Sequence, residues 1–303
     1  MHLMVQCVRF REMLMAFTRR ELRQRYVGSI LGRAWPLLQP LLMLAVYYVV
    51  FINLFDLKLP SEFAQRIAAA LGDGSDGERL GQLWNVLLLC AGLLPWLMTA
   101  EFVVRATGVV VENGGLVKKV RFPSELLPIS LLASYMFNLL LLSVIFAGVV
   151  WAFTPFRTEI WWLFFPTLIL HGVFLLGVAY LLTTVNVFIR DMGQLVPLVV
   201  NVWFFLTPIV YLREQLVGPD HKPKPLAIMF DWNPMAYFVD LYRWALVVPE
   251  SIRETYGPDG KEHFITMNEI WRHFGIVAVV SFGVLLIGYK VFMANKYKFA
   301  DEI

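Results

Sequence analysis

The sequence has 303 residues, of which 58% are hydrophobic and 16% are charged, and its formal net charge is +3 at pH 7. Soluble domains are about 45–50% apolar and about 25% charged, so this composition excludes an ordinary soluble domain and requires lipid as a second solvent. The small net charge gives no support to nucleic-acid binding.

The first part of the chain is basic and amphipathic and does not have the pattern of a cleavable signal peptide. Apolar side chains recur at helical spacing from Phe10 to Phe17, and seven arginines lie between residues 9 and 33. This pattern predicts an interfacial helix over about residues 9–32, with its arginines toward anionic lipid headgroups. The alternative is that the positive charge only orients the first span. The arginines in question are Arg19, Arg20, Arg23 and Arg25.

Six apolar runs are long enough to cross a bilayer, which takes about 20 residues of helix. The third and fourth exceed this length, so we expect them to tilt, to kink at Pro128 or Pro166, or to project beyond the lipid. The sequence therefore predicts an all-α integral membrane protein with six transmembrane helices in one domain. The six runs cover about residues 34–55, 83–104, 126–153, 160–189, 195–212 and 274–294.

The connection between the second and third runs, about residues 110–123, mixes apolar, basic and backbone-breaking residues. Gly114 and Gly115 permit a sharp break, and Pro123 disfavours helix at Phe122. The short basic segment between them suits docking into a cleft of a partner protein. The alternative is a solvated loop that carries the positive charge of the cytoplasmic side.

The long connection before the last run, about residues 213–272, is apolar in its middle but too broken to span. Asp231, Pro234, Asp240 and Arg243 interrupt it. We predict short re-entrant or interfacial helices here, because non-spanning backbone at membrane depth must be buried in protein or line a water-filled cavity. The aromatic residues suited to an interfacial belt are Trp232, Tyr237, Tyr242 and Trp244.

Lysines and arginines are concentrated in the segments that one orientation places inside the cell. With the N-terminus inside, cytoplasmic segments hold 15 of the 26, and the two short outside loops hold four. Both termini are therefore expected in the cytoplasm.

The sequence lacks the motifs of common catalytic and nucleotide-binding sites. It has no phosphate-binding loop, no H-E-x-x-H, no C-x-x-C and no G-x-S-x-G pattern, so we expect no enzyme activity, metal or cofactor in this chain. Cys7 and Cys90 lie in unlike surroundings, and we expect no disulfide between them. His171 is the one histidine inside a predicted span, and we favour a structural hydrogen bond over a functional role.

The predicted spans also lack the mid-membrane acidic residues of ion-coupled transporters. Glu101 lies near a span end, four residues before Arg105, which is the spacing of an intrahelical ion pair. Energy for uphill transport would therefore have to come from another subunit.

Four segments, in order, resemble the permease subunits of type-2 ABC exporters, in the branch that exports polysaccharides and polyol-phosphate polymers. The first outside loop, about residues 61–82, is longer than the family pattern and looks like an insertion. The matching segments are RYVGSILG at 25–32 with WPLLQPL at 35–41, residues 113–128, Arg190-Asp191 with TPIVY at 207–211, and NPMAY at 233–237 with YRW at 242–244.

The resemblance implies a homodimer of six-helix permeases in the bacterial inner membrane, with two separate ABC ATPase subunits that bind ATP and magnesium on the cytoplasmic side. It implies that the basic N-terminal helix flanks the cytoplasmic entrance and that the broken helices of the last outside loop line or gate the exit. The implied ATPase-coupling residues are Glu112, Asn113, Lys118, Lys119, Arg121 and Phe122, with Arg190 and Asp191 as a second, smaller contact.

The resemblance also implies a polysaccharide, lipid-linked glycan or polyol-phosphate polymer as substrate. Aromatic walls can stack on the C–H faces of sugars and still let a polymer slide; the alternative for each such residue is packing or lipid contact. The candidates are Tyr47, Tyr48, Phe51, Trp203, Phe204, Phe205 and Tyr211.

Two other functions stay open. One is export of a small amphiphile, such as a drug or lipid, by the same kind of permease. The other is a membrane-embedded transferase of envelope assembly, for which Asp231, Asp240 and His263 are the nearest approach to a polar cluster.

Overall fold

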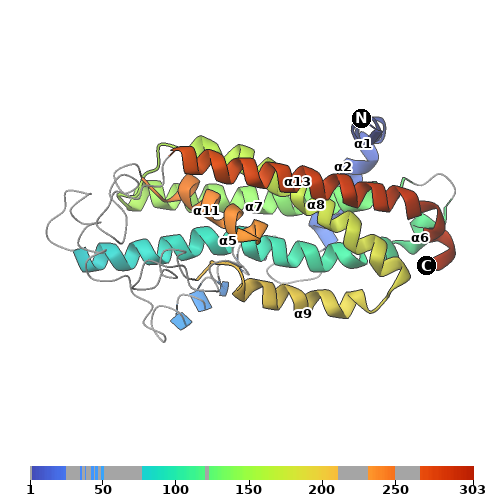
Figure 1. The fold of residues 1–303 in the computed structure, drawn as a ribbon, viewed down its shortest axis with the longest axis horizontal. Coiled ribbons are helices and arrows are strands. Elements are labelled where there is room, and N and C mark those ends of the chain that lie inside the picture. The colour runs from blue at the N-terminus through green and yellow to red at the C-terminus, as the bar shows by residue number, and fades with distance from the viewer. Residues whose placement is uncertain are drawn as a thin grey trace.

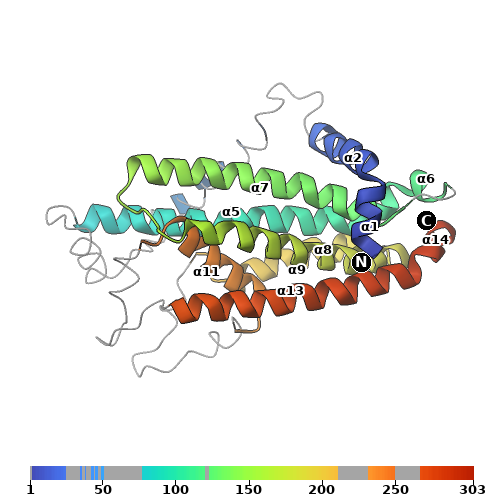
Figure 2. The ribbon, with the colours of Figure 1, turned by 90° about the horizontal axis from the view of Figure 1, so that it is seen from above.

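A computed structural model describes residues 2–24, 77–119, 123–210, 231–249 and 267–303, with single positions between residues 35 and 50. All regular elements in these residues are helices. The long helices lie lengthwise in an elongated bundle, and both chain ends lie toward the end that carries α6 (Figures 1 and 2). Most of the first predicted span and residues 61–76 of the first outside loop fall outside the described residues, whereas residues 77–82 of that predicted loop form the start of a helix.

Four helices are long and apolar enough to cross a membrane, and they contain or overlap the second, third, fourth and sixth predicted spans. The fifth predicted span corresponds to α9, an apolar helix of 14 residues. The six-span count itself stays a prediction. In chain order the elements are α1 (His2–Arg9), α2 (Arg11–Gln24), α5 (Gly77–Glu112), α6 (Gly114–Val117), α7 (Leu126–Phe153), η3 (Trp161–Leu163), α8 (Phe164–Phe188), α9 (Met192–Phe205), α11 (Pro234–Leu246), α13 (Met267–Asn295), η5 (Lys296–Lys298) and α14 (Phe299–Glu302).

Helix α5 is much longer than the membrane requires. Its 36 residues extend about 54 Å at 1.5 Å per residue, against a hydrocarbon core of about 30 Å. The helix continues past the predicted end of the second span to Glu112, and it is long enough to project beyond the lipid. Pro128 and Pro166 each lie at the third position of α7 and α8, where no backbone N–H is needed, so they mark helix starts and not kinks.

The basic N-terminal segment forms two helices in the described residues, α1 and α2, which meet at a turn at Phe10. The predicted apolar stripe is half-buried, and α2 packs against α7. Figure 2 shows α2 lying across the outside of α7. The stripe therefore faces the bundle, while Arg19 and Arg23 are exposed.

The most extensive helix pair is α8 with α13, and two glycines allow its close approach. A methyl group at Gly177 would lie 2.5 Å from the backbone nitrogen of Leu285, and one at Gly288 would overlap the carbonyl oxygen of Gly177. Small residues at such crossings let helix backbones touch inside a membrane. Helix α5 occupies the centre of the bundle, whereas α7 and α13 expose wide apolar faces suited to lipid.

Helix α11 is a short helix, and 11 of its 13 residues are buried. It packs against α5, α8 and α13. The predicted aromatic belt needs correction, because Tyr237, Tyr242 and Trp244 are buried inside the protein and only Trp232 is exposed. Their rings contact Phe164, His171 and His273 on the neighbouring helices, so they help to hold α11 in position.

Candidate functional site

The connection after α5 presents charge to solvent at the α6 end of the bundle. The helix ends at Glu112, and α6 begins after Asn113 with the amide of Leu116 donating to the Asn113 carbonyl at 2.8 Å. Glu112, Lys118 and Lys119 are exposed. The arrangement is a compact knob with basic side chains on its surface. Two predicted coupling residues, Arg121 and Phe122, lie outside the described residues.

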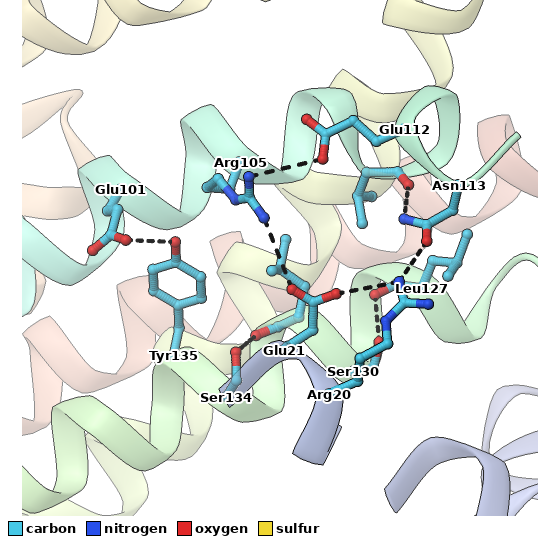
Figure 3. Close-up of polar contacts among 12 residues, drawn as sticks. Arg20, Glu21, Glu101, Arg105, Glu112, Asn113, Leu127, Ser130, Ser134 and Tyr135 are labelled. Atoms are coloured by element: carbon cyan, nitrogen blue, oxygen red, sulfur yellow. Dashed lines mark hydrogen bonds and ion pairs between the residues drawn. The ribbon is translucent and has the colours of Figure 1, made fainter. Parts of the chain in front are cut away.

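A hydrogen bond joins the N-terminal helix to this knob. The Arg20 guanidinium on α2 donates to the Asn113 side-chain carbonyl at 2.6 Å, and the Asn113 amide donates to the carbonyl of Val109 at 2.8 Å (Figure 3). From the sequence, Arg20 was predicted to lie at the cytoplasmic entrance and Asn113 in the ATPase-coupling segment. In the folded chain they are joined by a hydrogen bond, so α2 is tied to the start of α6.

A chain of charges runs beside that bond. Glu21, whose side chain is buried between α2 and the bundle, lies 3.9 Å from Arg105, and Arg105 lies 3.8 Å from Glu112 (Figure 3). These separations exceed hydrogen-bonding distance and Arg105 is nearly half exposed, so each pair contributes little alone. Glu101 accepts a hydrogen bond of 3.0 Å from Tyr135 on α7.

The Arg190–Asp191 turn joins α8 to α9, and both side chains are exposed. Figure 1 places this turn at the same end of the bundle as α6. The two segments predicted to contact an ATPase therefore share one end of the molecule. Of the predicted entrance arginines, Arg25 lies outside the described residues.

Nearer the opposite end, Asn233 joins the end of α9 to the start of α11. Its side-chain amide donates to the Leu206 carbonyl and to the Thr207 hydroxyl, both at 2.9 Å. Its side-chain oxygen caps α11 by accepting from the Met235 amide at 3.0 Å and also accepts from the Trp203 indole at 2.9 Å. Asparagine directly before a proline is a helix-start signal that the sequence did display.

Arg243 makes the second link between these segments. Its guanidinium is buried and donates to the carbonyls of Leu88 on α5, at 3.1 Å, and Pro208, at 2.9 Å, and also to that of Ile209. Gly92 leaves room for it, because a methyl there would lie 3.2 Å from the guanidinium. The described parts of the two matched segments, residues 207–210 and 233–244, thus form one hydrogen-bonded assembly on α5.

His171 is fully buried and joins three helices. One ring nitrogen lies 2.8 Å from the Thr99 hydroxyl on α5, and the other lies 3.1 Å from the Tyr242 hydroxyl on α11. The predicted structural hydrogen bond to a neighbouring helix is confirmed.

The candidate aromatic residues of α9 lie in three different settings. Trp203 packs edge-on against Trp96 and bonds Asn233, and Phe204 is buried against the same indole. Phe205 is exposed. The remaining candidates, Tyr47, Tyr48, Phe51 and Tyr211, lie outside the described residues.

One face of α9 combines apolar and amide side chains. Gln194, Leu198, Asn201 and Phe205 recur at helical spacing, and all four are exposed on the protomer. An amide surrounded by hydrocarbon leaves its hydrogen-bonding groups unsatisfied, which costs about 1–3 kcal/mol. This face therefore suits water or another protein surface better than lipid.

Comparison with known proteins gives one family and several relatives. The family model described as "ABC-2 type transporter" matches residues 12–247. An O-antigen export system permease protein RfbA of Klebsiella pneumoniae is 22% identical over 292 residues, which cover 96% of this chain and 94% of the relative. The RfbA permease of Myxococcus xanthus is 26% identical over 234 residues, which cover 77% of this chain and 80% of the relative.

Proposed function

The chain belongs to the ABC-2 type transporter family, and from that premise we propose that it is the membrane-spanning permease of an ATP-driven exporter that carries a polysaccharide or lipid-linked glycan across the inner membrane. The observation that carries the proposal is the extent of the similarity. Relatives named as O-antigen export permeases align over 94% of their own length, so the likeness covers the whole permease and not one shared motif.

The α6 end is proposed as the cytoplasmic surface that receives an ABC ATPase. The sequence has no phosphate-binding loop, so ATP and magnesium are assigned to that separate subunit. The exposed charges of Lys118, Lys119, Arg190 and Asp191 support this placement, because they share one end of the bundle. Exposed charges at an interface act mainly on association rate and partner choice.

The transported polymer is proposed to pass along α9 of two protomers. The supporting feature is the exposed face with Gln194, Leu198, Asn201 and Phe205. Amides can exchange hydrogen bonds with sugar hydroxyls, and Phe205 can stack on the C–H face of a ring. Binding of this kind is weak and repeated, which suits a polymer that must keep moving.

The assembly of α9, residues 206–210 and α11 is proposed as the exit side of this path. Short helices that do not cross the membrane are tolerated at membrane depth when they are buried in protein. The near-complete burial of α11, with Asn233 and Arg243 bonded to the end of α9, meets this condition. Motion of α9 would therefore move α11 with it.

Deletion of the gene and complementation in the native host test the proposal. Loss of surface polysaccharide, restored by the wild-type gene, is the expected result.

The purified chain in lipid nanodiscs should hydrolyse no ATP alone and should form an ATPase complex with the ABC ATPase from its gene neighbourhood. Normal surface polysaccharide in the deletion strain, with loss of drug or lipid efflux, would refute the polymer in favour of a small amphiphile. Glycosyl transfer by the isolated chain would refute the permease role.

A further inference from the structure

Residues 296–303, which comprise η5, α14 and Ile303, fold back over the α6 end of the bundle. Phe299 is fully buried between Phe292 of α13, with ring centroids 5.2 Å apart, and Phe188 at the end of α8, at 6.3 Å. Figures 1 and 2 both show this end of the chain beside α6. The segment is therefore anchored, and its flanking residues are held against their neighbours.

One neighbour is the first residue of α6. The Ile303 side chain occupies the space above Gly114, where an added methyl would overlap its Cγ2 atom and lie 3.7 Å from its Cβ atom. Gly114 is buried, and α14 contacts α6. A methyl group at position 114 could fit only if the Ile303 side chain shifted, so the contact seen here requires glycine.

A second neighbour is Glu125, which follows the connection at its other end. The Lys296 ammonium lies 3.6 Å from the Glu125 carboxylate, whose side chain is 2% exposed. The Tyr180 hydroxyl donates to the Glu125 carbonyl at 3.0 Å. A buried carboxylate depends on its cation, since removal of one partner leaves an uncompensated charge. The same eight-residue segment therefore holds both ends of the connection between α5 and α7.

The third neighbour is the turn between α8 and α9. Arg190 donates to the carbonyl of Glu302 at 3.4 Å, a long and exposed hydrogen bond. This bond is weak alone, but Phe188, two residues before Arg190, packs against Phe299 and holds the turn close to the C-terminal segment. The segment thus touches both places that are predicted to meet an ATPase.

We propose that residues 296–303 are a positioning element that holds α6 and the Arg190–Asp191 turn together as one rigid docking surface for the ATPase subunit. This inference rests on the proposed function. A surface assembled from two loops transmits a partner's movement only if the loops keep their spacing, and the anchored Phe299 provides a fixed point for both. Ile303 and Lys296 act through α6 and α7 and need not touch the ATPase.

The test is a double-mutant cycle on the contact of Ile303 with Gly114, read by amide hydrogen exchange of the full chain in lipid nanodiscs. Gly114→Ala creates the overlap, and Ile303→Ala removes the Cγ2 atom. Each should speed exchange of the four hydrogen-bonded amides from Leu116 to Lys119 about tenfold, because overpacking and cavities both loosen local structure. The double variant should return to within about twofold of wild type, because the two methyl groups then meet at ordinary contact distance.

Gly115→Ala is the matched control. It makes the same change one residue along α6, where no atom of the described residues lies within 4 Å of the added methyl. Combined with Ile303→Ala, its effect should be additive, whereas the Gly114 pair should compensate. Exchange in α8 around Gly177 should stay unchanged in every variant, which shows that the bundle remains folded.

Surface polysaccharide in cells gives the functional readout at equal permease abundance. Ile303→Ala and Gly114→Ala should each lower it severalfold, and the double variant should restore it. Unchanged α6 exchange in both single variants, or full export despite loosened α6, would overturn the inference. If Lys118→Glu/Lys119→Glu also leaves export intact, the proposed docking of the ATPase at the α6 end fails as well, so the two failures are distinguishable.

Discussion

Substitution Gly177→Ala should disrupt the close contact between α8 and α13. The added methyl would lie 2.5, 2.6 and 2.7 Å from three backbone atoms of α13, at Val284 and Leu285, whereas ordinary contact begins at 3.4 Å. Backbone atoms cannot rotate aside, so α8 and α13 must separate by up to about 0.9 Å near this point. A gap of that size forfeits about a quarter to a half of each nearby dispersion contact.

The net effect combines two terms. Overpacking costs about 1–3 kcal/mol and should be near the upper limit here, whereas alanine gains about 0.5–1 kcal/mol over glycine inside a helix. We expect a loss of about 2 kcal/mol in the free energy of unfolding, or about 5 °C in the apparent melting temperature. Thermal unfolding of the detergent-purified chain, followed by size-exclusion chromatography, measures it.

Gly283→Ala is the control for this prediction. It makes the same change on α13, where nothing in the described part of the chain lies within 4 Å of the added methyl. Its melting temperature should equal or slightly exceed that of the wild type. Equal melting temperatures for Gly177→Ala and Gly283→Ala would refute the glycine contact.

Three further substitutions test the polar links. Arg243→Lys should cost about 3 kcal/mol of stability and abolish export, because an ammonium cannot reach the Leu88 and Pro208 carbonyls together; thermal unfolding and surface polysaccharide measure it. Asn233→Ala removes the α11 cap and two donated bonds, so a loss of about 2 kcal/mol is expected by the same thermal assay. Arg20→Ala should leave the melting temperature within about 2 °C but lower ATPase activity of the reconstituted complex severalfold, because α2 is no longer tied to α6.

Conservative variants separate these effects from general damage. Asn233→Asp keeps the capping oxygen and should retain more stability than Asn233→Ala. Arg20→Lys keeps a donor near Asn113 and should retain more ATPase activity than Arg20→Ala. Wild-type stability for Arg243→Lys would contradict the role of the Arg243 hydrogen bonds. Equal ATPase activity for both Arg20 variants would contradict the role of the Arg20–Asn113 hydrogen bond.

The described long helices were largely predictable from the sequence. Helix α7 has the predicted bounds, 126–153, and α8 differs from its predicted span by a few residues. These elements are long apolar runs that begin near prolines and end in polar segments, and such runs have few alternatives in a bilayer. The break at Gly114 was also visible, because glycine pairs end helices readily.

The long-range polar contacts could not be predicted in the same way. Arg243 reads as a charge that interrupts an apolar stretch, yet its acceptors include Leu88, which lies 155 residues earlier in the chain. The contact of Ile303 with Gly114 joins residues that no local pattern links. The sequence also does not show which side of such a helix is buried, because a helix that is apolar all round, such as α8, has no periodic pattern of polar residues. Trp203 and Phe205 were therefore given the same predicted role, although in the fold Trp203 is packed against Trp96 and Phe205 is exposed.

The most direct test of the account is polymer uptake by proteoliposomes that contain this chain with the ABC ATPase on the outer surface. Wild-type vesicles should accumulate glycan in the lumen only when ATP and magnesium are present. Lys118→Glu/Lys119→Glu vesicles should accumulate none, while Lys118→Arg/Lys119→Arg vesicles should behave as wild type. ATP-dependent uptake that is unchanged by the charge reversal would contradict the claim that the ATPase acts on the permease through the connection after α5.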